Sequence, residues 1–485
     1  MRKAVTILAM LFCVIANCTA TANDYETIKS RLNEKSLPLV NITVEIEKVS
    51  KPEYTPATIE VTDPQKRTNG EETATFNCKV KYRGASSSGY DKKSFAVKLL
   101  NEKDKSLDVN MFGIREDDAW ILDAMAIDRI RMRNRLNFDI WNDMSQTPYN
   151  TDNGNRNGTM GYFVELFING EYHGLYCFTD KVNRKLLGVK KAKENDDNSV
   201  TIKGVAYKCA SWGDSAFLKG YDDQDMTNTI WNAWELDYPD DYPCEEAYTP
   251  LKNFIDFCAN TTDTEFADGL DDNLYINNFI DYHVFIMSQG LIDNAMKNTY
   301  LSIVDKSKGK RMMITPWDLD ASLGGYWNGR YYDYNSQNST MLAVRPYKRL
   351  WDNNVNGYAD AVANRWRKLA YNGILSKEAF NERIDSYANA FIESGAWQRE
   401  YEKWNNNPVP LKQDITVETN YVKRWYSRNF DHLENIVFKD YGTTGIKNVE
   451  KDNANDDILY NILGQKVDHD YKGIVIKNGK KTYQM

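Results

Sequence analysis

Gln289-Gly-Leu-Ile-Asp293-Asn-Ala-Met-Lys-Asn298-Thr-Tyr300 is the most informative segment of this chain of 485 residues. It places a carboxylate, Asp293, ahead of an amide, Asn298, in a stretch that follows an apolar, helix-like run. A short basic loop, Lys306 to Arg311, comes next. This pattern predicts a functional loop between a helix and a strand.

A second acidic pair follows an apolar, strand-like run in Met312-Met-Ile-Thr-Pro-Trp-Asp318-Leu-Asp320-Ala-Ser-Leu-Gly324. Residues i and i+2 of an extended segment share a face, so Asp318 and Asp320 can reach one cation. Mg²⁺ takes oxygen ligands and few protein carboxylates, which suits Asn298 with one or both of these residues; Mn²⁺ is an alternative ion. The structural alternative is that Asp320 caps the following turn while Trp317 packs in the core.

These side chains suit phosphoryl transfer, which needs a carboxylate at the acceptor hydroxyl and metal ligands that hold Mg²⁺ against the phosphates. The spacing from Asp293 to Asn298 equals that of a protein-kinase catalytic loop, and Asp318 follows the next strand as the kinase metal Asp does. Asp-Asn is also a favoured turn pair, so a purely structural Asp293 is the alternative.

Three upstream blocks extend the pattern, and with them the chain resembles the spore-coat CotH family of atypical, secreted protein kinases. The blocks are Tyr82-Arg-Gly-Ala-Ser-Ser-Ser88 with Lys92-Lys-Ser-Phe-Ala-Val-Lys-Leu99, Trp120-Ile-Leu-Asp-Ala124 with Asp128 and Arg133-Asn134, and Val164-Glu-Leu-Phe-Ile-Asn-Gly-Glu-Tyr-His-Gly-Leu-Tyr176 running into Thr179-Asp-Lys181.

The resemblance implies a kinase that transfers the γ-phosphoryl group of ATP to Ser or Thr of an unidentified extracellular or cell-surface protein. Asp293 would be the catalytic base, and Asn298, Asp318 and Asp320 would hold the metal. A non-catalytic surface or adhesion protein on the same scaffold is one rival. A metal-dependent glycosyltransferase is another, because Asp318-Leu-Asp320 also reads as a nucleotide-sugar metal motif.

The resemblance also suggests where the nucleotide phosphates bind. Ala96 and Lys98 share a strand face, as the adenine-side Ala and the phosphate-binding Lys do in kinases. Lys93 competes with Lys98 for that role. Arg83, beside a Gly- and Ser-rich turn, and Arg133 are the further candidates for phosphate contact.

The order of the predicted elements fits an α+β, two-lobed atypical protein-kinase-like fold, and it also fits other α+β folds. We predict a strand-rich N-lobe over 23–180, a mainly helical C-lobe over 181–440, and a linker with a small β tail over 441–485. Hairpins are expected between 76–82 and 95–99 and around Asn169-Gly170. Helices are expected over 126–144, 274–288 and 358–369.

Both ends of the chain carry targeting patterns. Residues 1–22 form a basic, apolar, then small-residue sequence typical of a signal peptide, with cleavage expected before Asn23. A lipid-modified Cys18 is the alternative. The tail resembles the sorting module of secreted Bacteroidetes proteins, and a small packed β appendage is the alternative. We therefore expect a secreted or cell-surface protein, with the periplasm or a lipoprotein as alternatives and no transmembrane segment.

The composition argues against several other classes of protein and site. The net charge of −8 argues against general nucleic-acid binding, which requires a basic footprint. Five cysteines follow the leader, and Cys209, Cys244 and Cys258 could include one disulfide. A Cys-x2-Cys pattern is absent, which makes a structural zinc site a poor fit.

Overall fold

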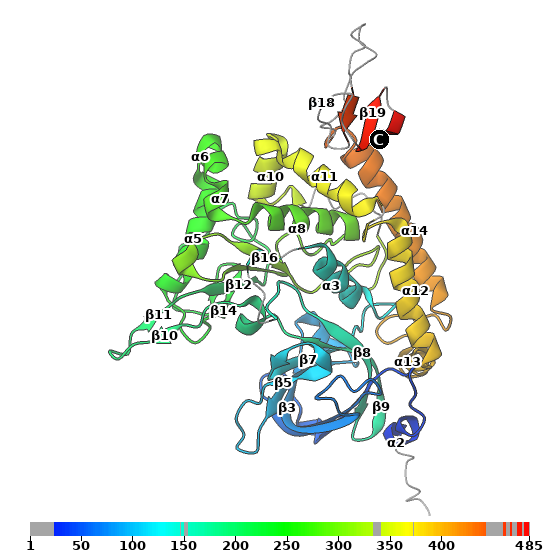
Figure 1. Cartoon of the computed structure of the whole chain (residues 1–485). Coiled ribbons are helices and arrows are strands. Elements are labelled where there is room, and N and C mark those ends of the chain that lie inside the picture. Colours follow the sequence, from blue (N-terminus) through cyan, green and yellow to red (C-terminus); the bar gives the residue numbers. More distant parts are fainter. Residues whose placement is uncertain are drawn as a thin grey trace, which may run out of the picture.

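The computed structural model describes residues 24–145, 147–149, 154–332, 341–371 and 373–442, together with short strands between 459 and 484. The predicted signal peptide and most of the predicted linker lie outside these residues. Figure 1 shows a strand-rich unit and, beside it, a sheet covered by helices. Helices and strands are therefore largely segregated, as an α+β fold requires.

The first unit is a closed barrel in the order β1-β2-β3-β4-β7-β9-β8, and β1 closes it by pairing in parallel with β8. Alternate residues such as Val97 and Leu122 point into an apolar interior, because successive side chains of a strand face opposite sides. The barrel strands are β1 Leu39–Val44, β2 Thr55–Thr62, β3 Thr73–Arg83, β4 Ser94–Leu100, β7 Ala119–Asp123, β8 Gly161–Ile168 and β9 Glu171–Asp180.

Both predicted hairpins are confirmed. β3 pairs antiparallel with β4, with Tyr82 opposite Phe95, and β8 turns into β9 at Asn169-Gly170, where Asn169 adopts a φ of 52°. The predicted helix over 126–144 begins later, as α3 Arg133–Met144. The reason is local: the Asp128 carboxylate accepts the backbone N–H groups of Met132 and Arg133 and so organises a turn ahead of the helix.

The second unit contains a sheet that the sequence analysis did not predict. Its order is β13-β14-β12-β15-β16, so residues 181–440 are not simply helical. Helices pack on one face of this sheet, and residues 182–189 pack on the other against Tyr300 and Met313. The strands are β12 Val205–Cys209, β13 Ile230–Trp231, β14 Trp234–Tyr238, β15 Thr299–Ile303 and β16 Met313–Pro316.

The predicted helices over 274–288 and 358–369 are confirmed as α8 and α11. In Figure 1, α12 and α14 run along one side of the molecule and α13 lies at the barrel end of that side. The main helices are α5 Glu245–Asn260, α6 Asp263–Asp268, α7 Leu270–Asn273, α8 Ile276–Gln289, α10 Arg345–Asp352, α11 Tyr358–Ala370, α12 Lys377–Glu393, α13 Ala396–Trp404 and α14 Thr416–His432.

Smaller elements complete the described chain, among them the predicted short strands of the tail, which form a sheet in the order β18-β17-β19-β20. They are α2 Asp24–Lys29, α4 Arg184–Leu187, β5 Val109–Asn110, β6 Glu116–Asp117, β10 Lys193–Glu194, β11 Val200–Thr201, β17 Leu459–Asn461, β18 Lys466–Val467, β19 Gly473–Lys477 and β20 Lys480–Gln484.

Helix α13 joins the two units through buried charges. Glu400 accepts hydrogen bonds from Lys92 Nζ at 2.5 Å, Arg131 Nε at 2.7 Å and the backbone N–H of Leu175 at 2.7 Å. Its neighbour Arg399 donates two bonds of 2.7 Å to Glu165. The barrel is thus fixed against the helical unit by a network whose centre, Glu400 with Lys92 and Arg131, is fully buried.

The cysteines after the leader are all free, so a disulfide among Cys209, Cys244 and Cys258 does not form. Cys209 and Cys258 are buried and act as small apolar side chains. Among the residues that the structure describes, no helix has the length and apolar character needed to cross a bilayer.

Candidate functional site

The antiparallel pair β15–β16 brings the two motifs together. Thr299, the first residue of β15, lies opposite Pro316, the last of β16. Asn298 and Trp317 are therefore neighbours, and the Trp317 N–H donates to the Asn298 carbonyl at 2.9 Å. Asp318 follows immediately, so one strand register places the amide of the first motif beside the acid of the second.

Asn294, which the sequence analysis passed over, ties the two loops. Its buried amide nitrogen donates to the carbonyls of Trp317 at 2.6 Å and Asp318 at 3.3 Å. Further along, the Leu323 N–H donates to the Gln289 carbonyl at 2.8 Å. The loop after α8 and the loop after β16 are consequently one hydrogen-bonded assembly.

Asp293 lies at the edge of this assembly. Its Oδ2 accepts from Lys297 Nζ at 2.7 Å and from the Asn298 side-chain nitrogen at 3.0 Å, while 14% of its side chain is exposed. With the Asn298 nitrogen donating to Asp293, the oxygen of the same amide remains available as a ligand for a hard cation. A single amide thus links the predicted base to the predicted metal site.

Asp318 and Asp320 form no ion pair among the described residues and lie among other carboxylates. Solvent reaches Asp318, yet protein surrounds it closely enough that desolvation is the largest cause of its raised pKa, which the charges of Asp123 and Asp293 raise further. Desolvation and the neighbouring Asp318 hold the pKa of Asp320 well above its usual range. A divalent cation bound here would relieve this repulsion, so the donor set fits a metal.

The barrel supplies a third carboxylate, Asp123 at the end of β7, which the sequence analysis quoted within a motif but did not assign to the site. Asp123 Oδ2 accepts from the Asn134 amide at 2.7 Å, and Asn134 Oδ1 accepts from the Leu319 N–H at 3.0 Å. The bridge holds Asp123 next to the Asp318–Asp320 turn. The Trp120-Ile-Leu-Asp123 motif was the sequence signal that could have identified Asp123 as a site residue.

Arg83 and Lys98, two of the predicted phosphate-binding residues, share the outer face of β3 and β4 but lie at different distances from the acidic pair. The Arg83 guanidinium lies 5.5 Å from the Trp317 ring, and its charge lowers the pKa of Asp318, opposing the larger effect of desolvation. Lys98 pairs with Lys79, four residues before Arg83, which corresponds to roughly 13 Å along the strand. Arg83 is therefore the nearer cation to the acidic pair.

The other two candidates are held by local contacts. Lys93 Nζ donates to the carbonyls of Ser88 at 3.0 Å and Tyr90 at 2.7 Å, which secures the Ser-rich turn. Arg133 is buried, forms an ion pair with Asp128, and donates from Nε to the Ser322 carbonyl at 3.1 Å. Both residues support the loops around the site.

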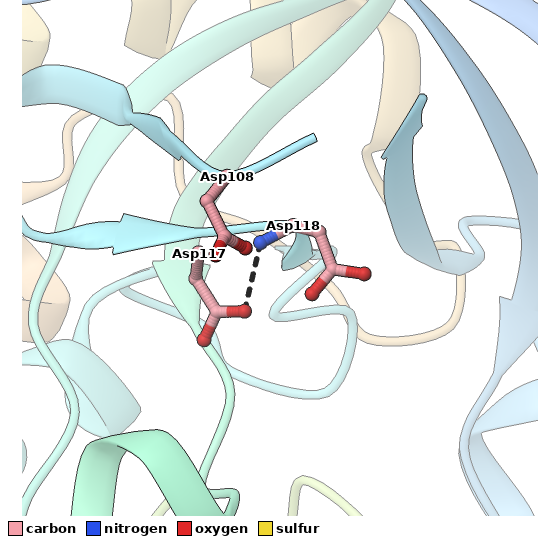
Figure 2. Close-up of side chains that lie close together, drawn as sticks. All are labelled: Asp108, Asp117 and Asp118. Carbon is pink, nitrogen blue, oxygen red and sulfur yellow. Dashed lines mark hydrogen bonds between the residues drawn. The ribbon is translucent and has the colours of Figure 1, made fainter. Parts of the chain in front are cut away.

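A separate acidic group, Asp108, Asp117 and Asp118, brings three carboxylates within 4.8 Å of one another (Figure 2). Lys185 Nζ lies 2.5 Å from Asp108 and 3.6 Å from Asp117, and Arg115 pairs with Asp117. In contrast to Asp318 and Asp320, these carboxylates are neutralised by cations of the chain itself.

Together, the fold and the site define an α+β protein in which two cross-linked loops present a carboxylate, an amide and an acidic pair. A family model described as CotH kinase protein matches residues 80–433. This span exceeds half of the chain, so the protein belongs to the CotH kinase family, and membership supports a kinase-type transferase. No curated protein matches the chain.

Proposed function

We propose that this protein is a two-lobed, atypical kinase that transfers the γ-phosphoryl group of ATP to a Ser or Thr hydroxyl of a partner protein. The observation that carries the proposal is the Asn298 amide, which donates to Asp293 and adjoins Asp318 through the β15–β16 register. Family membership supports the reaction class.

In this proposal Asp293 accepts the proton of the acceptor hydroxyl as the new P–O bond forms, while the bond from the γ-phosphorus to the β–γ bridging oxygen breaks and ADP leaves. Asn298 and Asp318 would hold Mg²⁺, and Asp320 would support it. The metal, when bound, neutralises phosphate charge in the transition state. Arg83, close to the acidic pair, would contact the phosphates, and Lys98, further along the same strand face, would orient the nucleotide.

The proposal includes a secreted or cell-surface location, supported by the leader pattern of residues 1–22 and by the sorting-like tail. N-terminal sequencing and intact mass of protein from its native host test this part. We expect a mature chain that begins at Asn23. A lipid-modified Cys18 contradicts that expectation.

The catalytic assignment is tested by Asp293→Asn and Asp318→Asn, assayed for labelled-phosphate transfer to protein and for ATP affinity. Asp293→Asn should spare Mg–ATP binding, because the residue faces the acceptor, and should reduce transfer by on the order of 10²-fold or more. Asp318→Asn should weaken both, because it removes a metal ligand. Melting curves serve as the folding control.

The two variants give different signatures, which a general loss of stability does not reproduce. Unchanged transfer by Asp293→Asn contradicts the assignment of the base. If the parent binds ATP but transfers no phosphate, the rival interpretation as a non-catalytic scaffold replaces the proposal.

A further inference from the structure

The basic loop after β15, Lys306 to Arg311, has no role in the proposed reaction, yet it lines a cavity of about 390 Å³. Lys308 and Arg311 of the loop line this cavity together with Lys190. The segment of Lys190 is joined to the end of β15 by backbone, since the Lys190 N–H donates to the Val304 carbonyl at 2.9 Å. The volume lies in the range typical of small-ligand pockets, roughly 300–1,000 Å³.

Positive charge exceeds negative charge in this cavity. Within the described chain, Lys190, Lys308 and Arg311 form no ion pair, whereas the adjacent Lys306 is paired with Glu246 at 3.2 Å. The carboxylate that lines the cavity, Asp305, accepts the Ser307 hydroxyl at 2.6 Å and the Ser307 N–H at 3.0 Å. The Ser307 hydrogen bonds, and then the charges of Lys308 and Lys190, lower the pKa of Asp305, so this carboxylate offsets part of the positive charge. Three cations around a single carboxylate still favour an anionic ligand in a chain of net charge −8.

The cavity wall is shaped by aromatic rings and a tight turn. The Arg311 guanidinium lies 4.8 Å from the Tyr275 ring, which positions it at the cavity, and Tyr149 also lines the cavity. Gly188 has a φ of 67°, and a Cβ at this position would lie 2.5 Å from the Asn155 amide, so the turn must approach Asn155 closely. Rings beside cations suit a ligand that carries both an anionic group and an apolar stem.

The cavity is distinct from the reaction site. Strand β15 connects them, with Asn298 before its first residue and Val304 after its last, and six residue steps correspond to roughly 20 Å. The ATP that reacts at Asp293 and Asp318 therefore cannot place its phosphates in this cavity.

We propose that this cavity binds a phosphoryl group carried on a Ser or Thr of a protein chain, so that the protein docks segments that are already phosphorylated. A dianionic phosphoryl group forms charge-assisted hydrogen bonds with Lys and Arg, and its peptide stem packs on Tyr149 and Tyr275. The identification of the ligand as a phosphorylated protein rests on the proposed function, since such a segment is that reaction's product.

Binding of a fluorescent phosphoserine peptide to the full chain, followed by anisotropy, tests the inference. Its unphosphorylated twin, inorganic phosphate and Mg–ATP are compared as competitors. We expect the phosphopeptide to bind at least tenfold more tightly than its twin. Lys308→Gln combined with Arg311→Gln should reduce its affinity by about tenfold or more, the usual scale for losing hydrogen bonds to a charged group.

Lys103→Gln combined with Arg31→Gln is the matched control, because both residues are exposed cations elsewhere, and it should bind like the parent. The measurement is repeated with Asp318→Asn, whose binding should be unchanged. Equal affinity for the two peptides, displacement by inorganic phosphate at the same concentration, or loss of binding in Asp318→Asn overturns the inference. Phosphate transfer without phosphopeptide binding overturns it but leaves the proposed function intact.

Discussion

Two groups of buried or crowded charges behave in opposite ways. At the α13 contact, the carboxylate of Glu400 meets two cations, Lys92 and Arg131, and is fully buried. At the loop site, Asp318 and Asp320 face other carboxylates, and water still reaches Asp318. The first group holds two structural units together. The second is unfavourable as it stands, and a bound cation would relieve its repulsion, which makes it a candidate functional site.

The largest effect is expected from breaking the balanced group. Glu400→Gln leaves Lys92 and Arg131 buried without their carboxylate, and the free energy of unfolding should fall by about 3–5 kcal/mol. Chemical denaturation measures this loss. Glu402→Gln, at an exposed position of the same helix, is the matched control and should stay within about 0.5 kcal/mol of the parent. Equal losses in both variants would show that the network is not the cause.

A smaller effect on stability is expected from substituting Asp318 in the acidic group, and its sign depends on whether metal is present. Mg–ATP at a hundredfold excess over its dissociation constant should stabilise the parent by ~2.7 kcal/mol, and Asp318→Asn should lose most of this gain. The residue has a φ of 57°, which Asn tolerates.

With chelator present, Asp318→Asn should be at least as stable as the parent. A raised carboxyl pKa means that the folded state holds its proton more tightly than the unfolded chain. The parent therefore loses stability as the pH rises from the ordinary Asp pKa through the raised one, and the variant lacks this loss. Thermal melting of the parent and the variant across that pH range tests this prediction. A variant that melts well below the parent in chelator contradicts the repulsion.

The smallest effect at pH 7 is expected from Lys92→Met. Desolvation, aided by the Arg131 charge, lowers the Lys92 pKa to about 7. One carboxylate serves two cations, so removing Lys92 leaves Glu400 and Arg131 matched and should be neutral or slightly stabilising.

The pH dependence separates this variant from the parent. Between pH 7 and the ordinary Lys pKa of 10.5, the unfolded chain binds a proton that the folded chain has lost, so the parent gains stability as the pH rises. Lys92→Met should lack that gain. Parallel pH profiles for the two proteins would show that Lys92 stays fully charged.

Local patterns in the sequence predicted local structure well. The hairpin at Asn169-Gly170 and the helices α8 and α11 follow from turn chemistry and periodicity. The barrel closure by the parallel β1–β8 pair was not predicted, because it joins strands about 120 residues apart and no local signal encodes a long-range register. The sheet around β12 was missed because its strands are short and β12 pairs with β15, which lies far along the chain.

The candidate site shows the same limit. The spacing from Asp293 to Asn298 and the Asp318 motif could be recognised in the sequence, because the residues of each motif lie close together along the chain. The roles of Asn294 and Asn134 were not, because each acts through carbonyl or carboxylate contacts with a different segment. For the same reason, the sequence did not show which of the two cations lies nearer to the site. Arg83 lies beside Trp317, whereas the Lys93 ammonium donates to backbone carbonyls.

The α13 contact also sets an order in time. Lys92 and Arg131 leave the ribosome with the barrel, whereas Glu400 follows roughly 200 residues after strand β9 ends. At about 5–20 residues per second, the barrel waits for on the order of 10–40 s before its carboxylate partner emerges. During synthesis, the α13 contact between the two units therefore forms late, after the loop-site residues 289–324 have already emerged.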